Sequence, residues 1–424
     1  MCYAIPGRVT ALEGKNVTVD YFGEKKKAIN EIAELKIGDY IYAQGGFVIQ
    51  TVSEREAVET LETWKELFFQ LRATDLRLSR LDPAESGIER KISVILDRAA
   101  EGKGINKEEA LALMRLEKPA EIDYLYKIAN FLRQKYLSNS CCVHGIIEFS
   151  NFCRQNCAYC GIRAGNNSLN RYRMSEEEIM SAVTEAVDKH GFKALVLQSG
   201  EDPEFPPERL AKLIREIKQK HALLIFISVG EVGEAGLREL YEAGARGVLM
   251  RFETSDPRLY AAQHCGDLFS ERVKALESAY QLGYLILTGG LIGLPGQTKE
   301  SLIEDIFLAK KLHAEMFTFG PVLPSEVKPE LVLKVLAISR LIDPQNAKIV
   351  VTTGFETLDK NARRLGLLAG ASSVMLNVTP LKFRKLYNIY RNRAHEDETI
   401  ETQIKETLEL LYALGRAPTD LGSS

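Results

Sequence analysis

The central motif of the sequence is Ile146-Ile-Glu-Phe-Ser-Asn-Phe-Cys153-Arg-Gln-Asn-Cys157-Ala-Tyr-Cys160. Its first half is apolar and strand-like, and its second half is a loop that carries three cysteines in the spacing C-x3-C-x2-C. Thiolates are soft ligands that select iron–sulfur clusters or zinc, and a 4Fe–4S cluster normally has four protein ligands. Three thiolates on one loop would leave one iron of such a cluster open, so that a cofactor could bind there and be reduced.

A structural zinc knuckle is the alternative for the same loop. Zinc in structural sites takes four Cys or His ligands, so a fourth ligand would have to come from nearby. Cys142 or His144 could supply it. The segments after the loop favour the cluster, because they carry polar residues and glycines that a second cofactor would need.

From residue 144 onward, strand-like and helix-like segments alternate. Ser175-Glu-Glu-Glu178 is a capping box with an acidic first turn, and it predicts the start of the helix after the cysteine loop. Eight alternations predict an α/β fold, a TIM-type (β/α)8 barrel over residues 141–412, with its chemistry on loops at the carboxyl ends of the strands. The expected strands are 144–149, 193–197, 223–228, 246–250, 284–292, 314–319, 348–352 and 373–377.

The residues before the barrel divide into two parts. Residues 1–78 contain short β-branched runs separated by turns, which predict a small β-barrel, and then a helix that begins at the capping box Ser53-Glu-Arg-Glu56. Residues 79–140 are helical in pattern, with a second capping box at Asn106, and predict a helical connector. Residues 413–424 are expected to be a frayed tail.

Composition restricts the class of protein. The chain has 424 residues and a net charge of −3, so bulk charge gives no sign of nucleic acid or an anionic membrane as a partner. It has no run of about 18 apolar residues that could cross a membrane, and its first residues lack the features of a signal peptide. Seven cysteines, three of them in one motif, indicate reduced thiols rather than disulfides. We therefore expect a cytoplasmic protein.

The spacing of Cys153, Cys157 and Cys160 resembles the cluster loop of the radical S-adenosylmethionine (SAM) superfamily. In that superfamily the open iron chelates the amino and carboxylate groups of SAM. An electron from the cluster then cleaves SAM to methionine and a 5′-deoxyadenosyl radical. The resemblance implies a 4Fe–4S cluster and SAM as cofactors, and it places Tyr159 beside the adenine.

The first candidate SAM contact follows the expected strand 193–197. Ser199-Gly-Glu-Asp202 resembles the superfamily's motif that holds the SAM amino group. Gly200 would let the backbone approach closely, and the carboxylates of Glu201 and Asp202 can accept hydrogen bonds. The structural alternative is an acidic turn after a strand.

Further candidate SAM contacts lie at later strand ends. Arg251 and Glu253 are two residues apart on a strand, so both side chains would point to one face. Arg251 could bind a carboxylate, helped by Arg272, or it could simply pair with Glu253. The run Gly289-Gly-Leu-Ile-Gly-Leu-Pro-Gly296 could let adenine pack on the backbone, or it could be an ordinary turn. Its candidate contact residues are Gly293 and Leu294.

Longer segments, in order from about residue 85 to 412, resemble the FeFe-hydrogenase maturase family HydE. These segments are 148–163, 171–178, 198–203, 251–254, 293–298, 368–380 and 384–390.

The HydE resemblance implies a radical SAM enzyme that acts on a cysteine-bound iron carbonyl cyanide complex during assembly of a two-iron hydrogenase centre. In that family the adenosyl radical attacks sulfur. The implied partners are an electron donor such as ferredoxin or flavodoxin and other hydrogenase-maturation proteins. The catalytic candidates are Thr352, Thr353 and Tyr387. Two further candidates for the inner cavity are Thr379 and Arg384.

Two features depart from the HydE pattern. No cysteine follows Cys265, so the second cluster of some relatives cannot form from cysteines near the C-terminus. Gly354-Phe-Glu-Thr357 stands where a smaller and more apolar run is expected, so Phe355 and Glu356 could reshape or recharge the cavity.

The segments 1–7, 38–43 and 46–50 resemble the HypC family of NiFe-hydrogenase chaperones. In that family the cysteine that matches Cys2 helps to carry an iron with cyanide and carbonyl ligands, a role suited to a thiolate. The family's histidine partner aligns with Gln44, and glutamine is a poor iron ligand. A docking module without iron is the alternative.

Three hypotheses follow. The first is a HydE-type enzyme with a small thiol-bound or iron-bound substrate. The second is a radical SAM enzyme with an organic substrate, because biotin synthase and methylornithine synthase are similar to HydE. The third is a scaffold without catalysis that transfers iron fragments.

Overall fold

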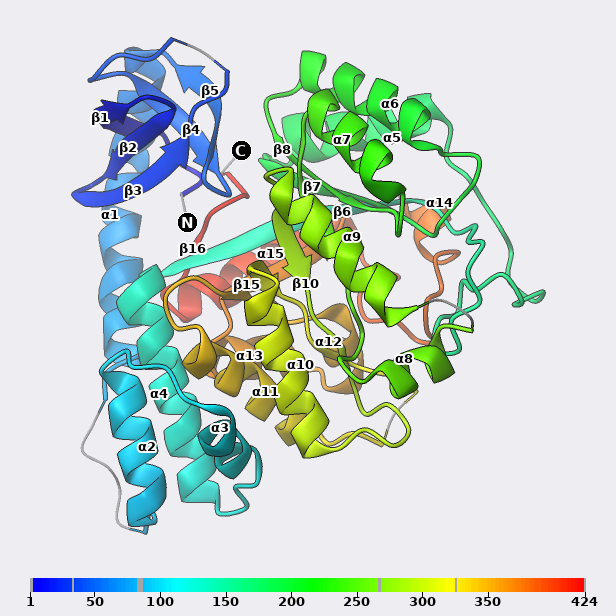
Figure 1. Cartoon of the computed structure of the whole chain (residues 1–424). Helices are drawn as coiled ribbons and strands as arrows, with labels where there is room; N and C mark the ends of the chain where they lie inside the picture. The colour runs from blue at the N-terminus through cyan, green and yellow to red at the C-terminus, as the bar shows by residue number, and fades with distance from the viewer. Residues whose placement is uncertain (1–2, 33, 82–86, 266–267, 325, 423–424) are drawn as a thin grey trace.

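A small closed β-barrel forms the N-terminal part of the computed structural model (Figure 1), which describes residues 3–32, 34–81, 87–265, 268–324 and 326–422. Its strand order is β1-β2-β3-β5-β4. Alternate residues of these strands, such as Val17 and Val19, are buried inside it, which is the period-2 pattern of a strand with one buried face. The predicted small barrel is therefore confirmed. Its strands are β1 Gly7–Glu13, β2 Asn16–Tyr21, β3 Glu24–Ile29, β4 Tyr40–Gln44 and β5 Phe47–Val52.

In the described parts of residues 54–137, four helices connect the small barrel to the rest of the chain. The side chain of Ser53 accepts a hydrogen bond from the backbone of Glu56, and Asn106 forms a capping box, so both predicted helix starts are confirmed. The buried guanidinium of Arg133 binds both carboxylate oxygens of Asp75 at 2.7 Å, which fixes the first helix against the fourth. The helices are α1 Glu54–Leu78, α2 Arg90–Ala100, α3 Lys107–Met114 and α4 Pro119–Leu137.

Eight parallel strands form the main barrel, in the order β14-β12-β10-β9-β8-β7-β6-β15. The two ends of this sheet meet, because Val351 N donates to Ser373 O at 3.0 Å and Ser372 N donates to Ile349 O at 2.9 Å. The predicted TIM-type barrel is confirmed as a nearly closed ring. Its strands are β6 Ser140–Ser150, β7 Ala194–Ser199, β8 Leu224–Ser228, β9 Ala245–Leu249, β10 Leu285–Thr288, β12 Ala314–Phe317, β14 Lys348–Ile349 and β15 Ser373–Asn377.

Helices surround this barrel, and α6 shows why they pack there. Its buried residues Leu210, Leu213, Ile214 and Ile217 repeat at helical spacing and form one apolar face. Ser175 forms the predicted capping box of α5. No helix of the described residues is long and apolar enough to span a bilayer. The helices are α5 Glu176–Thr184, continued by a π-helix Glu185–Lys189, α6 Pro207–Lys220, α7 Gly233–Ala243, α8 Pro257–Gln263, α9 Phe269–Gln281, α10 Lys299–Lys311, α11 Pro329–Ile342, α12 Thr353–Leu358, α13 Ala362–Leu368, α14 Leu381–Arg384 and α15 Ile400–Ala413; the short strands are β11 Leu291–Ile292 and β13 Gly320–Pro321.

The expectation of a frayed tail over 413–424 is wrong for the residues that the structure describes. Strand β16, Ala417–Pro418, pairs in parallel with Ser140 and Cys141 of β6, and residues 414–421 are buried. The backbone pairing and burial outweigh the usual fraying of a chain end, and the short tail with its glycines and proline has no strand-like pattern that would predict this pairing.

The small barrel packs on the main barrel at the amino ends of its strands. Tyr42 and Phe47 of the β4–β5 hairpin share one apolar cluster with Leu224, Phe226 and residues of several other strands. A Cβ added to Gly45 in this hairpin would lie 2.6 Å from Cδ2 of Leu224, and its φ of 55° also favours glycine at this close approach. The small barrel therefore lies opposite the end at which the loops after the strands gather.

Candidate active site

The cysteine loop follows β6 and is fixed by three other parts of the barrel. Arg154 N donates to Glu201 O at 2.9 Å, Ala158 N donates to Gln263 O at 2.8 Å, and Gly161 N donates to Ile389 O at 2.7 Å. A Cβ on Gly161 would lie 2.1 Å from Asn388 O, so the tight contact requires glycine. These bonds hold the loop in place between distant segments of the chain.

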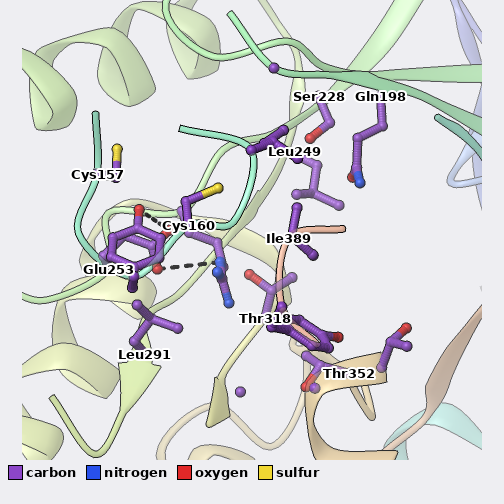
Figure 2. A pocket seen from close by; sticks show the side chains of 18 of the residues that line it. Cys157, Cys160, Gln198, Ser228, Leu249, Glu253, Leu291, Thr318, Thr352 and Ile389 are labelled. Atoms are coloured by element: carbon purple, nitrogen blue, oxygen red, sulfur yellow. Dashed lines mark hydrogen bonds and ion pairs between the residues drawn. The ribbon is translucent and has the colours of Figure 1, made fainter. Parts of the chain in front are cut away.

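A cavity of about 330 Å³ lies at this end of the barrel, and Cys153, Cys157 and Cys160 line it. All three cysteines are half-buried. Figure 2 shows Cys157 and Cys160 on one side of the cavity and Thr318 and Thr352 on the other. The volume is in the range of small-molecule sites.

The three thiols fit a multi-iron cluster better than a single ion. Burial, and after it the charge of Cys160, raises the pKa of Cys157 to about 12, and burial raises the pKa of Cys160 to about 11. Without a metal these groups therefore remain thiols, and bound iron would supply the positive charge that stabilises thiolates. The ligand atoms of a single ion would all lie within 4.8 Å of one another. In the described residues, the sulfur atoms of the three cysteines do not meet this condition.

The two residues considered as a fourth zinc ligand lie far from the cysteine loop. Cys142 and His144 lie at the beginning of β6, and the cysteine loop comes after its end, so neither can reach the loop. They line a different cavity.

The predicted segment Ser199–Asp202 is divided by the structure. Ser199, Gly200 and Glu201 line the cavity. A Cβ on Gly200 would lie 2.3 Å from Phe152 O, so glycine permits the cysteine loop to cross it. The carboxylate of Glu201 accepts hydrogen bonds from Arg154 and Gln155 at 2.9 and 3.1 Å.

Asp202 points elsewhere. Both of its carboxylate oxygens are bound by Arg173, at 2.7 and 2.8 Å, and Ser150 donates to it at 2.5 Å. The pKa of Asp202 is lowered: burial opposes ionisation, but the hydrogen bonds from Arg173 and Ser150 outweigh it. Asp202 therefore anchors Ser150 before the cysteine loop to Arg173 after it, and it lies outside the cavity.

Arg251 and Glu253 both line the cavity, and they also pair with each other. Their Nε and Oε2 atoms are 3.3 Å apart, and the hydroxyl of Tyr159 donates to Glu253 Oε1 at 3.1 Å (Figure 2). Glu253 has a φ of 66°, in the left-handed region that is costly for a residue with a side chain. The pair is therefore an ion pair on the cavity wall, where Arg251 can also reach a bound carboxylate.

Arg272 lines the cavity from α9, and its Nε atom lies 2.8 Å from Glu231 Oε1.

His264 is a cavity residue that the sequence analysis did not assign. Its Nδ1 lies 3.6 Å from Cys157 Sγ and its Nε2 lies 3.1 Å from the hydroxyl of Tyr159. Burial, together with Arg272 and Arg251, lowers the pKa of His264 to about 3, so the imidazole is neutral.

Gly293 and Leu294 do not line this cavity. Their backbone N–H groups donate to the side chain of Gln297 at 2.7 and 3.3 Å, so the run forms a turn before α10. Gly293 borders a separate surface hollow that Tyr159 also reaches.

Thr352, Thr353 and Tyr387 line the deeper wall, as predicted. Thr379 and Arg384 do not. The hydroxyl of Thr379 accepts a hydrogen bond from Glu148 N at 2.8 Å, and Arg384 donates to Thr379 O at 2.9 Å, so both support the wall from behind.

Three polar residues of the deeper wall were missed by the sequence analysis. Glu148 and Arg393 form a buried ion pair with an Nη2–Oε2 distance of 2.9 Å, and both line the cavity. The buried hydroxyl of Thr318 has no hydrogen-bond partner. Glu148 belongs to the central motif, but its partner is 245 residues away, so spacing gave no signal for the pair.

Only Gly354 of the departure from the HydE pattern at 354–357 lines the cavity. Phe355 is fully buried in the main core, and Glu356 pairs with Arg363 and with His395 at 3.2 Å. Neither Phe355 nor Glu356 lines the cavity. Cys265 is exposed, and Cys2 lies outside the described residues.

Comparison with known proteins agrees with this geometry. Residues 147–309 match the family model of the radical SAM superfamily. The [FeFe] hydrogenase maturase subunit HydE of Thermotoga maritima is 36% identical over 303 residues, which cover 69% of this chain and 86% of that protein. The chain belongs to the radical SAM superfamily. Residues 1–64 match the HupF/HypC family model, so the chain also carries a HypC-type domain.

A second relative and a solved structure show that the chain is also similar to enzymes with a different product. The 3-methylornithine synthase of Methanosarcina acetivorans is 31% identical over 335 residues, covering 76% of this chain and 93% of that protein. The crystal structure of methylornithine synthase (PylB) matches with a TM-score of 0.66 and 28% identity, covering 77% of this chain and 97% of that one. This radical SAM enzyme is thus similar both to a metal-centre maturase and to an enzyme that makes an amino acid.

Proposed function

We propose that this radical SAM enzyme is a HydE-type maturase that acts, during assembly of a hydrogenase iron centre, on a small thiol-bound or iron-bound substrate. The observation that carries the proposal is one cavity that joins the three loop cysteines to the polar wall of Thr318, Thr352 and Tyr387. The similarity to HydE and the HypC-type domain in the same chain support a substrate from hydrogenase maturation.

The residues at the mouth of the cavity fit a 4Fe–4S cluster and SAM. Cys153, Cys157 and Cys160 line one cavity from one loop and would hold three irons. When bound, the cluster supplies the electron that cleaves SAM to a 5′-deoxyadenosyl radical.

The side chains around the cysteines would orient SAM. Glu201 is held by Arg154 and Gln155 and offers its carboxylate to an ammonium group. Arg251 and Arg272 present guanidinium groups to a carboxylate. Tyr159 is fixed by Glu253, and its ring offers an apolar face to an adenine.

The deeper wall would bind the substrate and exclude water. Tyr387 is 3% exposed and Thr318 is 3% exposed, so a substrate there is shielded from solvent. Arg393 and Glu148 are paired, so the wall offers hydrogen bonds without an unbalanced charge.

The HypC-type domain would act as a docking module for other maturation proteins. No residue in its described part lines the cavity, so it does not hand a substrate directly to the site in this arrangement. Ferredoxin or flavodoxin would supply electrons.

The test is anaerobic reconstitution with iron and sulfide, followed by dithionite and SAM. The proposal expects 5′-deoxyadenosine in the absence of substrate. When a cysteine-bound iron complex is added, it expects a 5′-deoxyadenosyl thioether, in which the new carbon–sulfur bond replaces an existing bond of that sulfur to carbon or iron. Cleavage without a thioether would contradict the maturase role, whereas an intact cluster without any cleavage would support a scaffold that transfers iron fragments.

A second candidate is an enzyme with an organic substrate. The similarity to 3-methylornithine synthase over 93% of that protein favours it. Incubation of the reconstituted enzyme with free amino acids separates the two candidates, because only this one predicts an amino-acid product such as 3-methylornithine.

A further inference from the structure

A second group of metal-ligand side chains lies at the opposite end of the barrel from the cysteine loop. Cys142 and His144 are two residues apart at the start of β6, so both point to the barrel interior. Asp420 follows β16 and joins them from the other end of the sequence. The exposed fractions are 6% for Cys142, 4% for His144 and 2% for Asp420.

The three ligand atoms are close enough for one ion. They all lie within 4.8 Å of one another, and His144 Nε2 is 3.3 Å from Asp420 Oδ2. Two N or O ligands at 2.0–2.1 Å from a tetrahedral ion are about 3.3 Å apart. The hydroxyl of Thr419 and the backbone N–H of Val143 donate to Asp420 Oδ2 at 2.6 and 3.2 Å. Hydrogen bonds of this kind commonly orient the side chains that bind a metal.

The small barrel closes this group with a polar atom that has no partner. Gln44 is 1% exposed and lines the same cavity of about 20 Å³, enough for one ion or water. Its Nε2 donates to Tyr3 O at 3.4 Å, but its Oε1 has no hydrogen-bond partner. Buried polar atoms are normally satisfied, so the unpartnered Oε1 atom of Gln44 indicates a missing occupant in this cavity.

We propose that Cys142, His144 and Asp420 bind one divalent transition-metal ion, Zn²⁺ or Fe²⁺, between the two barrels. One thiolate, one imidazole and one carboxylate form a donor set that suits borderline ions of this kind rather than Mg²⁺ or Ca²⁺. Gln44 Oε1 completes the surroundings, either on the ion or through a water. An apolar layer that includes Phe226, Leu287 and Met316 separates the site from the active-site cavity.

The ion would tie the HypC-type domain to the barrel. Because ligands come from β6 and from the segment after β16, and Gln44 covers them, binding the ion stabilises the packing of all three segments. The competing account is a buried hydrogen-bonded group that needs no metal. The two accounts differ in metal content.

The first experiment uses Co²⁺ as a spectroscopic probe with the full-length variant C2A/C153A/C157A/C160A, which lacks the cluster cysteines and Cys2. The proposal expects cobalt–thiolate charge-transfer absorption that saturates at about one ion per chain. Adding C142S should abolish the absorption, whereas C141S, which changes the adjacent buried thiol, should leave it unchanged. Absence of the absorption, or its survival in C142S, would overturn the proposal.

The second experiment needs no removal of the cluster. The otherwise unmodified chain, carrying either C142S or C141S, is purified anaerobically, reconstituted, and analysed for zinc and iron by mass spectrometry. C142S should contain about one metal ion fewer per chain than C141S, and the element that is lost identifies the occupant. Equal metal content in the two variants would overturn the proposal. His144→Gln and Asp420→Asn should each weaken binding of Zn²⁺ at least tenfold in competition with a chelator.

Discussion

The two ends of strand β6 both carry cysteine, but they are built in different ways. At the carboxyl end, three half-buried cysteines from one loop line a cavity of about 330 Å³. At the amino end, one cysteine joins a histidine and a distant aspartate in a closed space of about 20 Å³. The open end is suited to the exchange of cofactor, electrons and substrate, and the closed end is suited to a permanent structural role.

Among the variants that test this comparison, Cys157→Ala should have the largest effect on activity. The variant loses one of three ligands, so it should lack the absorbance of a 4Fe–4S cluster and all SAM cleavage, while its circular dichroism stays native. The matched control is Cys265→Ser, which changes an exposed thiol outside the cavity and should retain both properties. SAM cleavage by Cys157→Ala would break the distinction between the two ends.

Arg393→Met tests whether the inner wall of the open end is truly buried. The change leaves the carboxylate of Glu148 without its ion-pair partner, and it should lower the free energy of unfolding by about 3 kcal/mol. Urea denaturation under anaerobic conditions measures this loss. The double variant Arg393→Met/Glu148→Gln should recover part of it, and a loss below about 1 kcal/mol for the single variant would indicate a solvated pair.

Gly45→Ala tests the packing that closes the other end. The added Cβ would lie 2.6 Å from Leu224 and 2.9 Å from Leu285, at a φ of 55°, so we expect a loss of about 1–3 kcal/mol in stability. Gly46→Ala is the matched control: its φ is 83°, but nothing lies within 4 Å of its added Cβ. Thermal unfolding should show a larger loss for Gly45→Ala, and SAM cleavage should be unchanged in both. Equal losses would show that the contact with the main barrel contributes nothing.

The smallest expected effect is that of Tyr387→Phe on the open end. The variant keeps the ring and loses only the hydroxyl, so SAM cleavage should persist while substrate turnover falls about tenfold, the worth of about one hydrogen bond. The measurement is the ratio of product to 5′-deoxyadenosine. An unchanged ratio would remove Tyr387 from the substrate site.

The cysteine loop of the open end was predictable from sequence because its three cysteines lie close together in the chain. Cys153, Cys157 and Cys160 lie on one loop, and the strand ends that face them follow from the repeated strand–helix pattern. That pattern also predicted the eight strands, and capping boxes at Ser53 and Asn106 predicted two helix starts.

The closed end was not predictable, because its residues meet only through tertiary packing. Asp420 is 277 positions from Val143, which lies between Cys142 and His144 in the chain. Gln44 belongs to the small barrel. The pairing of β16 with β6 brings Asp420 to the site, and the short tail carried no periodic signal for it. The same limit explains why the ion pair of Arg393 with Glu148 was missed and why Asp202 was assigned to SAM although Arg173 holds it.

The most direct test of the central claim is the amount of 5′-deoxyadenosine that the anaerobically reconstituted wild-type chain releases from SAM in the presence of dithionite. The account predicts 5′-deoxyadenosine and methionine in equal amounts, and none from Cys157→Ala. An intact 4Fe–4S cluster in the wild-type chain with no 5′-deoxyadenosine would contradict it.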